Sequence, residues 1–496
     1  MDEKKSIKTY KRLFIVVSII LVGVLCLQGI YWVKQREQTA NAVNMEQTAD
    51  TANTEQTADT MNTGQEALPA ESRCALSREG YTLQQVVVMS RHNIRAPLSG
   101  KGSVLDTLTP HEWFAWSSDP SDLSLRGGNA ETSMGQYFRK WLEKESLFPK
   151  NYQPEGDEVR IYANSKQRTI ATARFFTAGL FPAADVNVEY HMAFDQMDPV
   201  FEPKLHFLTD EYGKDVLEQV EKLYHEKVLA MEDNYALIED VIDVKESEAY
   251  KSGEFTGFKV DDLGMELVED KEPKPIGSLR TATSVADALV LQYLEESDPV
   301  KAAFGHKLSF DEWQQISEVK DLYNDVTFCS PLVAHNVVHP LLQEIRGELT
   351  KDGRKFTFLC GHDSDVGPVL TCLKAEGCEL AGAVETKTPI GGKIVFCRWL
   401  SPDGQDYMSV DLVYESSEQL QNLSVLGTDN PPYAVPQVLE GLEQNSDGLY
   451  KTEAVLERFD EAIGEYDKML EKYGLQNTAV PEDPSEIEEE ALDEAA

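Results

Sequence analysis

The stretch QQVVVMSRHNIRAPLSG, residues 84–100, decides how this chain folds. It contains a run of apolar residues over 86–89, which is the pattern of a strand buried on both faces of a sheet. Arg91, His92 and Arg95 come directly after this run. Charged side chains at the end of a buried strand mark either an ordinary exit to solvent or a site for an anion. The residues at the ends of the other predicted strands decide between the two.

A second segment, EVRIYANSKQRTIATARFFTAGLFP (158–182), has the same order of strand, loop and helix. Residues 159–163 are strand-like, and Asn164 and Ser165 are predicted to form a turn and to cap the next helix. Apolar residues recur at mainly helical spacing beyond this turn. Arg168 is therefore expected in the first turn of the helix, where the positive end of the helix dipole also favours an anion.

The third segment, KFTFLCGHDSDVGPVLTCL (355–373), repeats the pattern. A strand over 356–360 leads into a loop that contains His362 and Asp363, and a helix is predicted over 366–373. Ligands of open parallel sheets bind outside the carboxyl ends of the strands, often against helix N-termini. We therefore expect the side chains at the ends of the three strands to surround one anionic ligand.

Arginine and histidine at such a site suit a phosphate monoester. The guanidinium fork matches phosphate oxygens, and several cations together neutralise a transferring phosphoryl group. One histidine is then free to attack phosphorus and form a phosphohistidine, while Asp363 protonates the leaving alkoxide and later deprotonates water. This chemistry requires neither a metal nor another cofactor. Spacing alone does not decide whether His92 or His362 is the nucleophile.

The composition limits the partners of the protein. The chain has 496 residues and a formal net charge of −40, which argues against binding to nucleic acid or to an anionic membrane surface. The seven cysteines include no C-x-x-C pair, so a zinc site has little support, and a Cys372–Cys378 disulfide is left open. His335 and His339 have the i, i+4 spacing of a metal pair, but no third ligand is apparent.

Both ends of the chain lie outside the predicted core. Residues 13–33 are uncharged and long enough to span a bilayer, and the basic residues of 1–12 place the N-terminus in the cytoplasm. A polar repeat within 34–73 predicts a flexible stalk, and the acidic residues of 476–496 predict a disordered tail. We expect an uncleaved membrane anchor with the rest of the chain extracytoplasmic. Secretion after cleavage at the sequence Ala-Asn-Ala, 40–42, is the alternative.

The remaining chain divides by its patterns. The strand–loop–helix units fall in 74–190 and 323–475, which are expected to form the two parts of one α/β catalytic domain. Long charged stretches with helical periodicity, such as 216–244 and 281–296, dominate the segment between them. Residues 191–322 are therefore predicted to form an inserted α-helical lobe.

Several of these segments resemble the motifs of one family. SRHNIRAPL resembles the RHGxRxP signature of the histidine acid phosphatases, which are branch 2 of the histidine phosphatase superfamily. GHDSD resembles their HD motif, and ANSKQRT resembles the segment with their third phosphate-binding arginine. GKGSVL (100–105), MDPVFEP (197–203), TPIGGKIVFCRW (388–399) and VYESSEQLQN (413–422) are similar to bacterial periplasmic glucose-1-phosphatases, which are relatives of the bacterial phytases. The resemblance extends over about 81–448.

The resemblance implies a fold and a role for each residue. The implied fold is α/β, with a mostly parallel sheet flanked by helices as in a phosphoglycerate-mutase-like core, and with an inserted, mainly α-helical lobe. His92 is the nucleophile and Asp363 is the proton donor. The phosphate is held by Arg91, Arg95, Arg168 and His362.

Three further residues are candidates for substrate contacts or for pKa tuning. Asn93 stands where the family more commonly has glycine. Asp365 stands where it usually has asparagine, and a second carboxylate near Asp363 would raise the pKa of one of the pair and help to keep the acid protonated. The alternative is that Asp365 points away from the site. Asp198 is a candidate for binding sugar hydroxyls, with a turn at Asp198-Pro199 as the alternative.

We therefore expect a membrane-anchored phosphomonoesterase that hydrolyses sugar phosphates such as glucose 1-phosphate. Its partners would be a small phosphorylated substrate and, through residues 13–33, the membrane, while the sequence does not predict an oligomeric state. One alternative is a phytase that acts on inositol hexakisphosphate. Another is a phosphoglycerate-mutase-like enzyme, which would have a glutamate just after the R-H pair where this chain has Asn93 and Ile94. The last is an inactive, surface-anchored protein that binds phosphate ligands.

Overall fold

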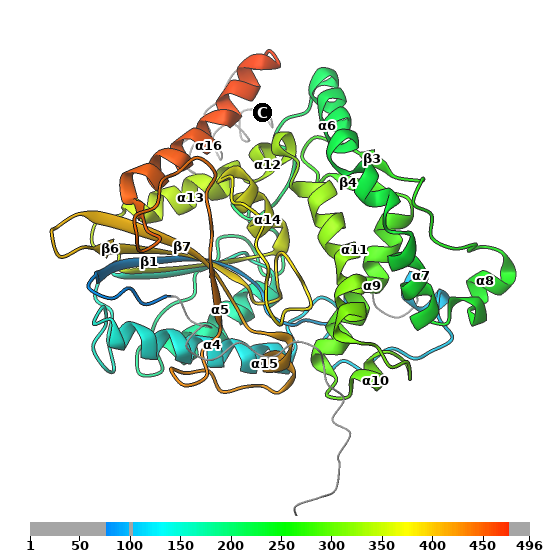
Figure 1. Cartoon of the computed structure of the whole chain (residues 1–496), viewed down its shortest axis with the longest axis horizontal. Helices are drawn as coiled ribbons and strands as arrows, with labels where there is room; N and C mark the ends of the chain where they lie inside the picture. The colour runs from blue at the N-terminus through cyan, green and yellow to red at the C-terminus, as the bar shows by residue number, and fades with distance from the viewer. Residues whose placement is uncertain (1–75, 99–102, 476–496) are drawn as a thin grey trace, which may run out of the picture. The chain divides into compact units, whose positions relative to one another are not determined.

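The computed structural model describes residues 76–98 and 103–475, all of which belong to one compact unit (Figure 1). The predicted anchor (13–33), stalk (34–73) and acidic tail (476–496) lie outside the described residues. Within the described part of the chain, no helix is both long enough and apolar enough to cross a bilayer. The described architecture is therefore that of the predicted catalytic region.

A seven-stranded sheet forms the centre of this unit. Its strands are ordered β2-β5-β1-β6-β7-β8, and β9 pairs with β7. Their bounds are Thr82–Arg91 (β1), Val159–Ala163 (β2), Phe356–Gly361 (β5), Lys393–Leu400 (β6), Asp406–Tyr414 (β7), Tyr433–Pro436 (β8) and Tyr450–Lys451 (β9). A separate two-stranded ladder joins β3 (Gly264–Glu266) to β4 (Lys274–Ile276).

The sheet is mixed, which corrects one part of the predicted fold. β2, β5 and β1 are mutually parallel, whereas β6, β7, β8 and β9 all pair antiparallel with their neighbours. Parallel pairs require long crossover connections, whereas the short turn 401–405 between β6 and β7 permits only an antiparallel pair. The predicted α/β class is confirmed, but the sheet is not mostly parallel, because four of its six described strand pairings are antiparallel.

The three parallel strands end in register. Arg91 of β1 pairs with Gly361 of β5, and Ala163 of β2 pairs with Cys360. The next peptide groups continue the ladder, since the His92 N–H donates to the Gly361 carbonyl at 3.0 Å. The loops after the three strands therefore leave the sheet side by side, as the sequence predicts.

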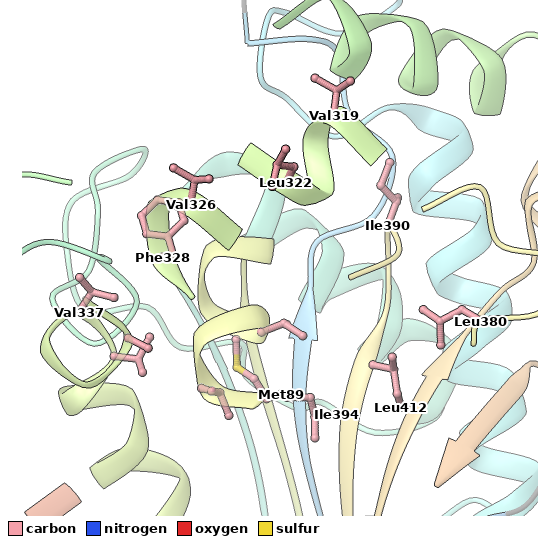
Figure 2. Close-up of a cluster of buried hydrophobic side chains, with 14 of the residues drawn as sticks. Met89, Val319, Leu322, Val326, Phe328, Val337, Leu380, Ile390, Ile394 and Leu412 are labelled. Atoms are coloured by element: carbon pink, nitrogen blue, oxygen red, sulfur yellow. The ribbon is translucent and has the colours of Figure 1, made fainter. Parts of the chain in front are cut away.

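Helices cover both faces of the sheet (Figure 1). Successive side chains of β1 point to opposite faces. Val86 and Val88 join Phe176 in a cluster on one face, and Val87 and Met89 join a second cluster on the other. Because both faces are covered, the strand is apolar at every position rather than at alternate ones. Figure 2 shows part of the second cluster, in which Met89, Ile394 and Leu412 extend from β1, β6 and β7.

The two helical layers come from different parts of the chain. α4 and α5 pack on the face of Val86 and Val88, while α13, α14 and α16 lie on the opposite face (Figure 1). The bounds of these helices are Leu125–Lys144 (α4), Gln167–Leu180 (α5), His339–Thr350 (α13), Asp363–Cys372 (α14) and Thr452–Lys472 (α16). The other helices are α3 (Val104–Thr107), α6 (Asp210–Leu229), α7 (Glu232–Val241), the 3-10 helix η1 (Val244–Glu246), α8 (Glu248–Ser252), α9 (Ser278–Glu295), α10 (Pro299–Ala302), α11 (Phe310–Phe328), α12 (Pro331–Val337) and α15 (Ser417–Gln421).

The stretches expected to be helical between residues 191 and 322 are helical. Residues 216–244 are divided mainly between α6 and α7, and nearly all of 281–296 lies in α9. Val216, Val220 and Tyr224, spaced four residues apart, are buried on one side of α6, as an amphipathic helix requires. That 191–322 forms a lobe of its own stays a prediction.

The cysteines and the histidine pair have structural surroundings. The described cysteines at 329, 360, 372, 378 and 397 are all free, so the Cys372–Cys378 disulfide that the sequence left open is not formed. His335 and His339 both contact α16: the His335 Nδ1 lies 3.1 Å from the Ala462 carbonyl, and His339 stacks on Tyr466. In the described ranges, no cluster of three metal-binding side chains surrounds either histidine.

Candidate active site

A pocket of about 550 Å³ opens at the carboxyl ends of β1, β5 and β2. Five of the six side chains that the sequence selects for phosphate chemistry line it: His92, Arg95, Arg168, His362 and Asp363. The sixth, Arg91, is buried behind the wall and makes an ion pair with Asp363. Residues from three distant loops therefore surround one cavity, as predicted, and side chains from α9 and α11 complete its wall.

His92 is held in one tautomer. Its Nδ1 lies 2.8 Å from the backbone carbonyl of Asn93. A carbonyl only accepts, so Nδ1 carries the hydrogen and Nε2 keeps its lone pair. The ring is buried, and burial lowers the pKa of His92, as do the nearby charges of Arg168 and Arg95. His92 is thus a neutral imidazole with an unprotonated Nε2, which is the form that attacks an electrophile.

His362 is held in the opposite sense by Asn164. The Asn164 Oδ1 accepts the backbone N–H of Asp198 at 2.9 Å, which fixes the direction of the amide. The Asn164 Nδ2 therefore faces His362 and donates to its Nε2 at 2.7 Å. Nδ1 of His362 then carries the hydrogen, and this buried atom has no hydrogen-bond partner within the described chain. His362 therefore has an unused donor that an anion in the pocket can accept.

The two rings lie edge to face, with their centroids 5.5 Å apart. Burial lowers the pKa of His362 as it does that of His92, and Arg168 lowers it further. Both imidazoles are therefore neutral near pH 7. Their hydrogen-bond partners make them different, because His92 keeps a lone pair on Nε2 while His362 keeps an N–H on Nδ1. This geometry distinguishes the two residues, which spacing could not do.

Six charged side chains alternate in sign beside the pocket, four of them in its wall and two, Arg91 and Glu385, behind it. They form five consecutive ion pairs: Arg95–Asp287 (3.1 Å), Asp287–Lys320 (3.1 Å), Lys320–Glu385 (2.8 Å), Glu385–Arg91 (2.9 Å) and Arg91–Asp363 (3.0 Å). We call this set the charge chain. Its three positive and three negative charges cancel, so it adds no net charge to the pocket.

Arg168 is a cation of the pocket wall that has no ion pair among the described residues. It is the second residue of α5, half-buried, and within the described chain it makes neither an ion pair nor a hydrogen bond. Burial, together with the charge of Arg95, lowers the pKa of Arg168 to about 10. An unpaired guanidinium on the wall of the pocket is favourable only if an anion joins it there.

Asp363 is ionised near neutral pH. Burial by itself would raise its pKa, but Arg91, Lys320 and Arg95 outweigh burial and hold the pKa well below its usual range. The carboxylate makes an ion pair with Arg91 at 3.0 Å. A dianion that binds to these cations would weaken their hold on Asp363 and raise its pKa.

Asp365 stabilises the backbone beside this site. Its Oδ2 accepts the backbone N–H of His362 at 2.8 Å, which caps the first turn of α14. Burial raises the pKa of Asp365, and the charge of Asp363 raises it further. The expectation that Asp365 would keep Asp363 protonated is therefore wrong in direction, because the carboxyl with the raised pKa is Asp365.

The other two candidates do not line the pocket. Asn93 donates from Nδ2 to Glu131 at 2.9 Å, and Glu131 does not line the pocket either. The Oδ1 of Asp198 accepts the backbone N–H of Val200 at 3.1 Å, which is the turn that the sequence offered as the alternative to a sugar contact. Both residues act on the backbone of the site.

The cap predicted at Asn164 and Ser165 is also corrected. The N-cap position of α5 is Lys166, and it makes no side-chain cap. Asn164 instead orients His362, and the Ser165 Oγ accepts the N–H of Met192 at 3.0 Å. A small polar residue after a strand signalled a turn, but the long-range partner of its side chain was not visible in the local pattern.

Sequence reasoning missed the residues that hold the arginines. Asp287 and Lys320 come from α9 and α11, and Glu385 lies in the connection before β6. All three side chains are largely buried. The one available signal was Asp287, a single acid inside the apolar run VADALVL. Lys320 and Glu385 have no comparable signal, because other polar or charged residues stand beside them in sequence, such as Asp321 and Thr386.

Comparisons with known proteins identify the family of this chain. The model of the histidine phosphatase superfamily (branch 2) matches residues 82–415. A glucose-1-phosphatase of Salmonella typhimurium is 36% identical over 389 residues, covering 78% of this chain and 92% of the relative. A glucose-1-phosphatase of Providencia rettgeri is 33% identical over 372 residues, covering 74% and 88%. The solved structure of the phytase from Citrobacter braakii matches with a TM-score of 0.70 at 25% identity, covering 78% of this chain and 98% of that one.

Proposed function

This chain belongs to the histidine phosphatase superfamily (branch 2), and we propose that it hydrolyses sugar phosphates such as glucose 1-phosphate through a phosphohistidine intermediate. The observation that carries the proposal is the pair of differently held imidazoles. His92 offers a lone pair and His362 offers a donor, at ring centroids 5.5 Å apart, beside the unpaired cation Arg168.

In the first step, the substrate dianion binds to Arg168, Arg95 and the Nδ1–H of His362, and competes with Asp363 for Arg91. The neutralised cations no longer depress the pKa of Asp363, so its carboxyl can hold a proton. The His92 Nε2 attacks phosphorus in line as the bond from phosphorus to the leaving oxygen breaks. Asp363 gives its proton to that oxygen, and the sugar leaves as a neutral alcohol.

In the second step, the carboxylate of Asp363 removes a proton from water. The water oxygen attacks phosphorus, the bond to His92 Nε2 breaks, and inorganic phosphate remains. The carbonyl of Asn93 keeps the hydrogen on Nδ1, so the departing imidazole returns to its starting tautomer. Both steps use the same cations to stabilise the charge on the phosphoryl oxygens.

Glucose 1-phosphate is the substrate we favour, because the relatives at 36% and 33% identity are glucose-1-phosphatases. A pocket of about 550 Å³ has room for a hexose phosphate. Its outer part has Glu272 as well as Lys166 and Arg280, so positive charge is not unopposed there. A substrate with one phosphate suits this balance better than a hexakisphosphate does.

The second candidate function is that of a phytase, which is favoured by the fold similarity to the phytase of Citrobacter braakii. Steady-state kinetics on glucose 1-phosphate and on phytate, measured with the same preparation, separate the two. We expect a higher kcat/KM for glucose 1-phosphate. A higher value for phytate would assign the enzyme to the second function.

The phosphohistidine is tested by rapid acid-free quenching with labelled substrate. We expect label on His92 of the wild-type protein and none on a His92→Ala variant. Absence of label, together with absence of phosphate release from p-nitrophenyl phosphate between pH 4 and pH 8, would instead favour a protein that only binds phosphate ligands.

The location of the protein is a proposal from sequence alone. We propose that residues 13–33 anchor it in a membrane with the catalytic region extracytoplasmic. Activity in the membrane fraction that becomes soluble on deletion of residues 1–33 supports the anchor. A soluble wild-type protein that begins after residue 42 would support the cleaved alternative.

A further inference from the structure

A second group of buried charges lies behind His92, away from the pocket. Lys393, the first residue of β6, makes an ion pair with Glu131 of α4 at 3.0 Å, and both side chains are fully buried. We call these two residues the sealed pair. Neither lines the cavity.

Stability does not explain the sealed pair. Removing two charges from water costs several kcal/mol per ion, and replacing a buried ion pair with apolar side chains is often neutral or stabilising. The aromatic rings of Phe176 and Phe358 lie within 6 Å of the Lys393 Nζ, at 5.8 and 5.9 Å, so the surroundings are those of a hydrophobic core. We therefore infer the role of the sealed pair from the hydrogen bonds that Glu131 and Lys393 make.

Both residues bind the two segments that flank the nucleophile. The Glu131 Oε2 accepts from the Nδ2 of Asn93 at 2.9 Å. The Lys393 Nζ donates to the carbonyl of Gly391 at 2.7 Å. Gly391 in turn donates its N–H to the carbonyl of His92 at 3.0 Å. His92 is therefore linked to the sealed pair in two ways. Its carbonyl is linked to Lys393 through Gly391, and the next residue, Asn93, is bonded to Glu131.

Asn93 has no freedom to turn. Its Oδ1 accepts the N–H of Ile94 at 2.8 Å, and its own N–H donates to the Thr172 Oγ1 at 3.1 Å. Gly391 has φ +69°, and a Cβ there would lie 2.6 Å from the Asn93 Nδ2. The remaining polar group of Asn93 is its backbone carbonyl, which accepts the Nδ1–H of His92. The position of this carbonyl is thus set by the side chain of the same residue.

We propose that Glu131 and Lys393 are positioning residues for the nucleophile. They fix Asn93, the Asn93 carbonyl holds the hydrogen on His92 Nδ1, and the lone pair stays on Nε2 where phosphorus is attacked. The inference rests on the proposed phosphohistidine mechanism. Asn93, Glu131 and Lys393 should therefore affect the rate of phosphoryl transfer and not the affinity for substrate, because none of the three lines the pocket.

The test is the double variant Glu131→Leu/Lys393→Met in the full chain. It removes both charges at once, so no unpaired charge is left in the core. With p-nitrophenyl phosphate we expect kcat and the rate of phosphoenzyme formation to fall about 100-fold, the cost of a misplaced reacting group. The KM and the inhibition constant of inorganic phosphate should stay within threefold of wild type.

A second variant and a control keep the test independent of folding. Asn93→Ala removes the link to Glu131 without touching the ion pair, and should show the same loss of kcat at unchanged KM. Glu415→Gln is the matched control. Glu415 is a buried carboxyl, and the charges of both Glu131 and Lys393 affect its pKa. Within the described residues it has no hydrogen bond to Asn93 or Gly391. Its kcat should equal that of wild type.

Histidine ¹⁵N chemical shifts distinguish positioning from general loosening. Wild type should show His92 with a protonated Nδ1 and an unprotonated Nε2, and the double variant a mixture of tautomers. Wild-type kcat and an unchanged His92 tautomer in the double variant would overturn the inference while leaving the proposed function intact. Absence of label on His92 in the wild-type enzyme would overturn the proposed function itself.

Discussion

The charge chain and the sealed pair lie on two sides of the same histidine and differ in their contact with the cavity. The charge chain runs along the pocket wall and ends at Asp363, whose side chain is 37% exposed. Lys393 and Glu131 are 0% exposed and do not line the cavity. A ligand can rearrange the first group of charges, whereas it cannot reach the second.

This difference indicates two uses of buried charge in one site. In the charge chain, Arg91 pairs with Asp363 and lowers its pKa. In the proposed mechanism a bound dianion would compete for Arg91, and the pKa of Asp363 would then rise. In the sealed pair, the charges have permanent partners and fix the position of backbone atoms. The first group would tune protonation, and the second would set geometry.

The largest expected effect is that of Arg168→Met, on the pocket side. Arg168 lines the pocket and has no ion-pair partner within the described residues, so it is free to bind an anion. We expect kcat/KM to fall by about 10³, as for the loss of a donor to the developing charge of a transition state. The free energy of unfolding should not fall, because no ion pair is broken. Activity assays and urea titrations measure the two quantities.

Arg174→Met is the control for this prediction. Arg174 lies on the same helix but is exposed, so the variant should retain wild-type activity and stability. If Arg168→Met lost stability and activity together, Arg168 would be part of a structural ion pair and would not be free to bind an anion.

On the sealed side, the single variant Lys393→Met should mainly destabilise the fold. It leaves the carboxylate of Glu131 buried without its counter-ion, and the expected loss of unfolding free energy is about 3–5 kcal/mol. The double variant with Glu131→Leu should recover most of that loss. Urea unfolding of the two variants and of wild type gives the comparison. A double variant as unstable as the single one would mean that the pair contributes net stability.

Lys320→Met tests whether the charge chain sets the protonation of Asp363. Lys320 lowers the pKa of Asp363 and pairs with Asp287 and Glu385, each of which keeps an arginine partner in the variant. Removing this cation should raise the pKa of Asp363. A general acid works only while protonated, so the alkaline limb of the kcat profile should move to higher pH by about one unit.

Lys320→Arg keeps the positive charge and is the control for this shift. Its pH profile should stay at the wild-type position even if its absolute rate falls. If Lys320→Met left the alkaline limb unmoved, the proton donor would be a group other than Asp363, or the charge chain would not act on it once substrate is bound.

The sequence predicted the elements of this site better than their contacts. The apolar runs before His92, Arg168 and His362 are local patterns, and they located three strand ends that meet in the structure. The mixed sheet was missed because the pairing of β6 depends on a short turn far from those motifs. Local patterns specify strands and helices, whereas strand order depends on connections.

The buried charges were missed for a similar reason. Glu131 and Lys393 are separated by more than half of the folded chain, and Lys320 appears in sequence as one charge among several on a helix. Asp365 was assigned to pKa tuning because it is close to Asp363 in sequence, while its side chain caps the helix and contacts the backbone of His362. The direction of a side chain at the start of a helix decides whether it caps the helix or contacts a neighbouring carboxylate. The spacing of residues in the sequence does not reveal that direction.

Glu415→Gln, beside the sealed pair, is expected to have the smallest effect on activity. It should nevertheless change the pH dependence of stability. Burial and the charge of Glu131 raise the pKa of Glu415 from 4.5 to about 8, although Lys393 acts in the opposite direction. Between these two values the folded protein holds a proton that the unfolded chain releases. Unfolding therefore becomes easier as pH rises from about 4.5 to about 8. Glutamine stays neutral in both states, so the variant should lose this part of the pH dependence.

Urea midpoints at pH 5, 6.5 and 8 measure this slope in wild type and in Glu415→Gln, with kcat at pH 6 as the check on activity. We expect the midpoint of the variant to exceed that of wild type by an amount that grows with pH. Equal slopes would mean that Glu415 is ionised in the folded protein. The sealed side would then hold two carboxylates against one lysine, and Lys393 would have to be shared between them. In that case the sealed side would differ from the charge chain in another way. Its negative and positive charges would not be equal in number, and Glu131 would not have Lys393 as a partner of its own.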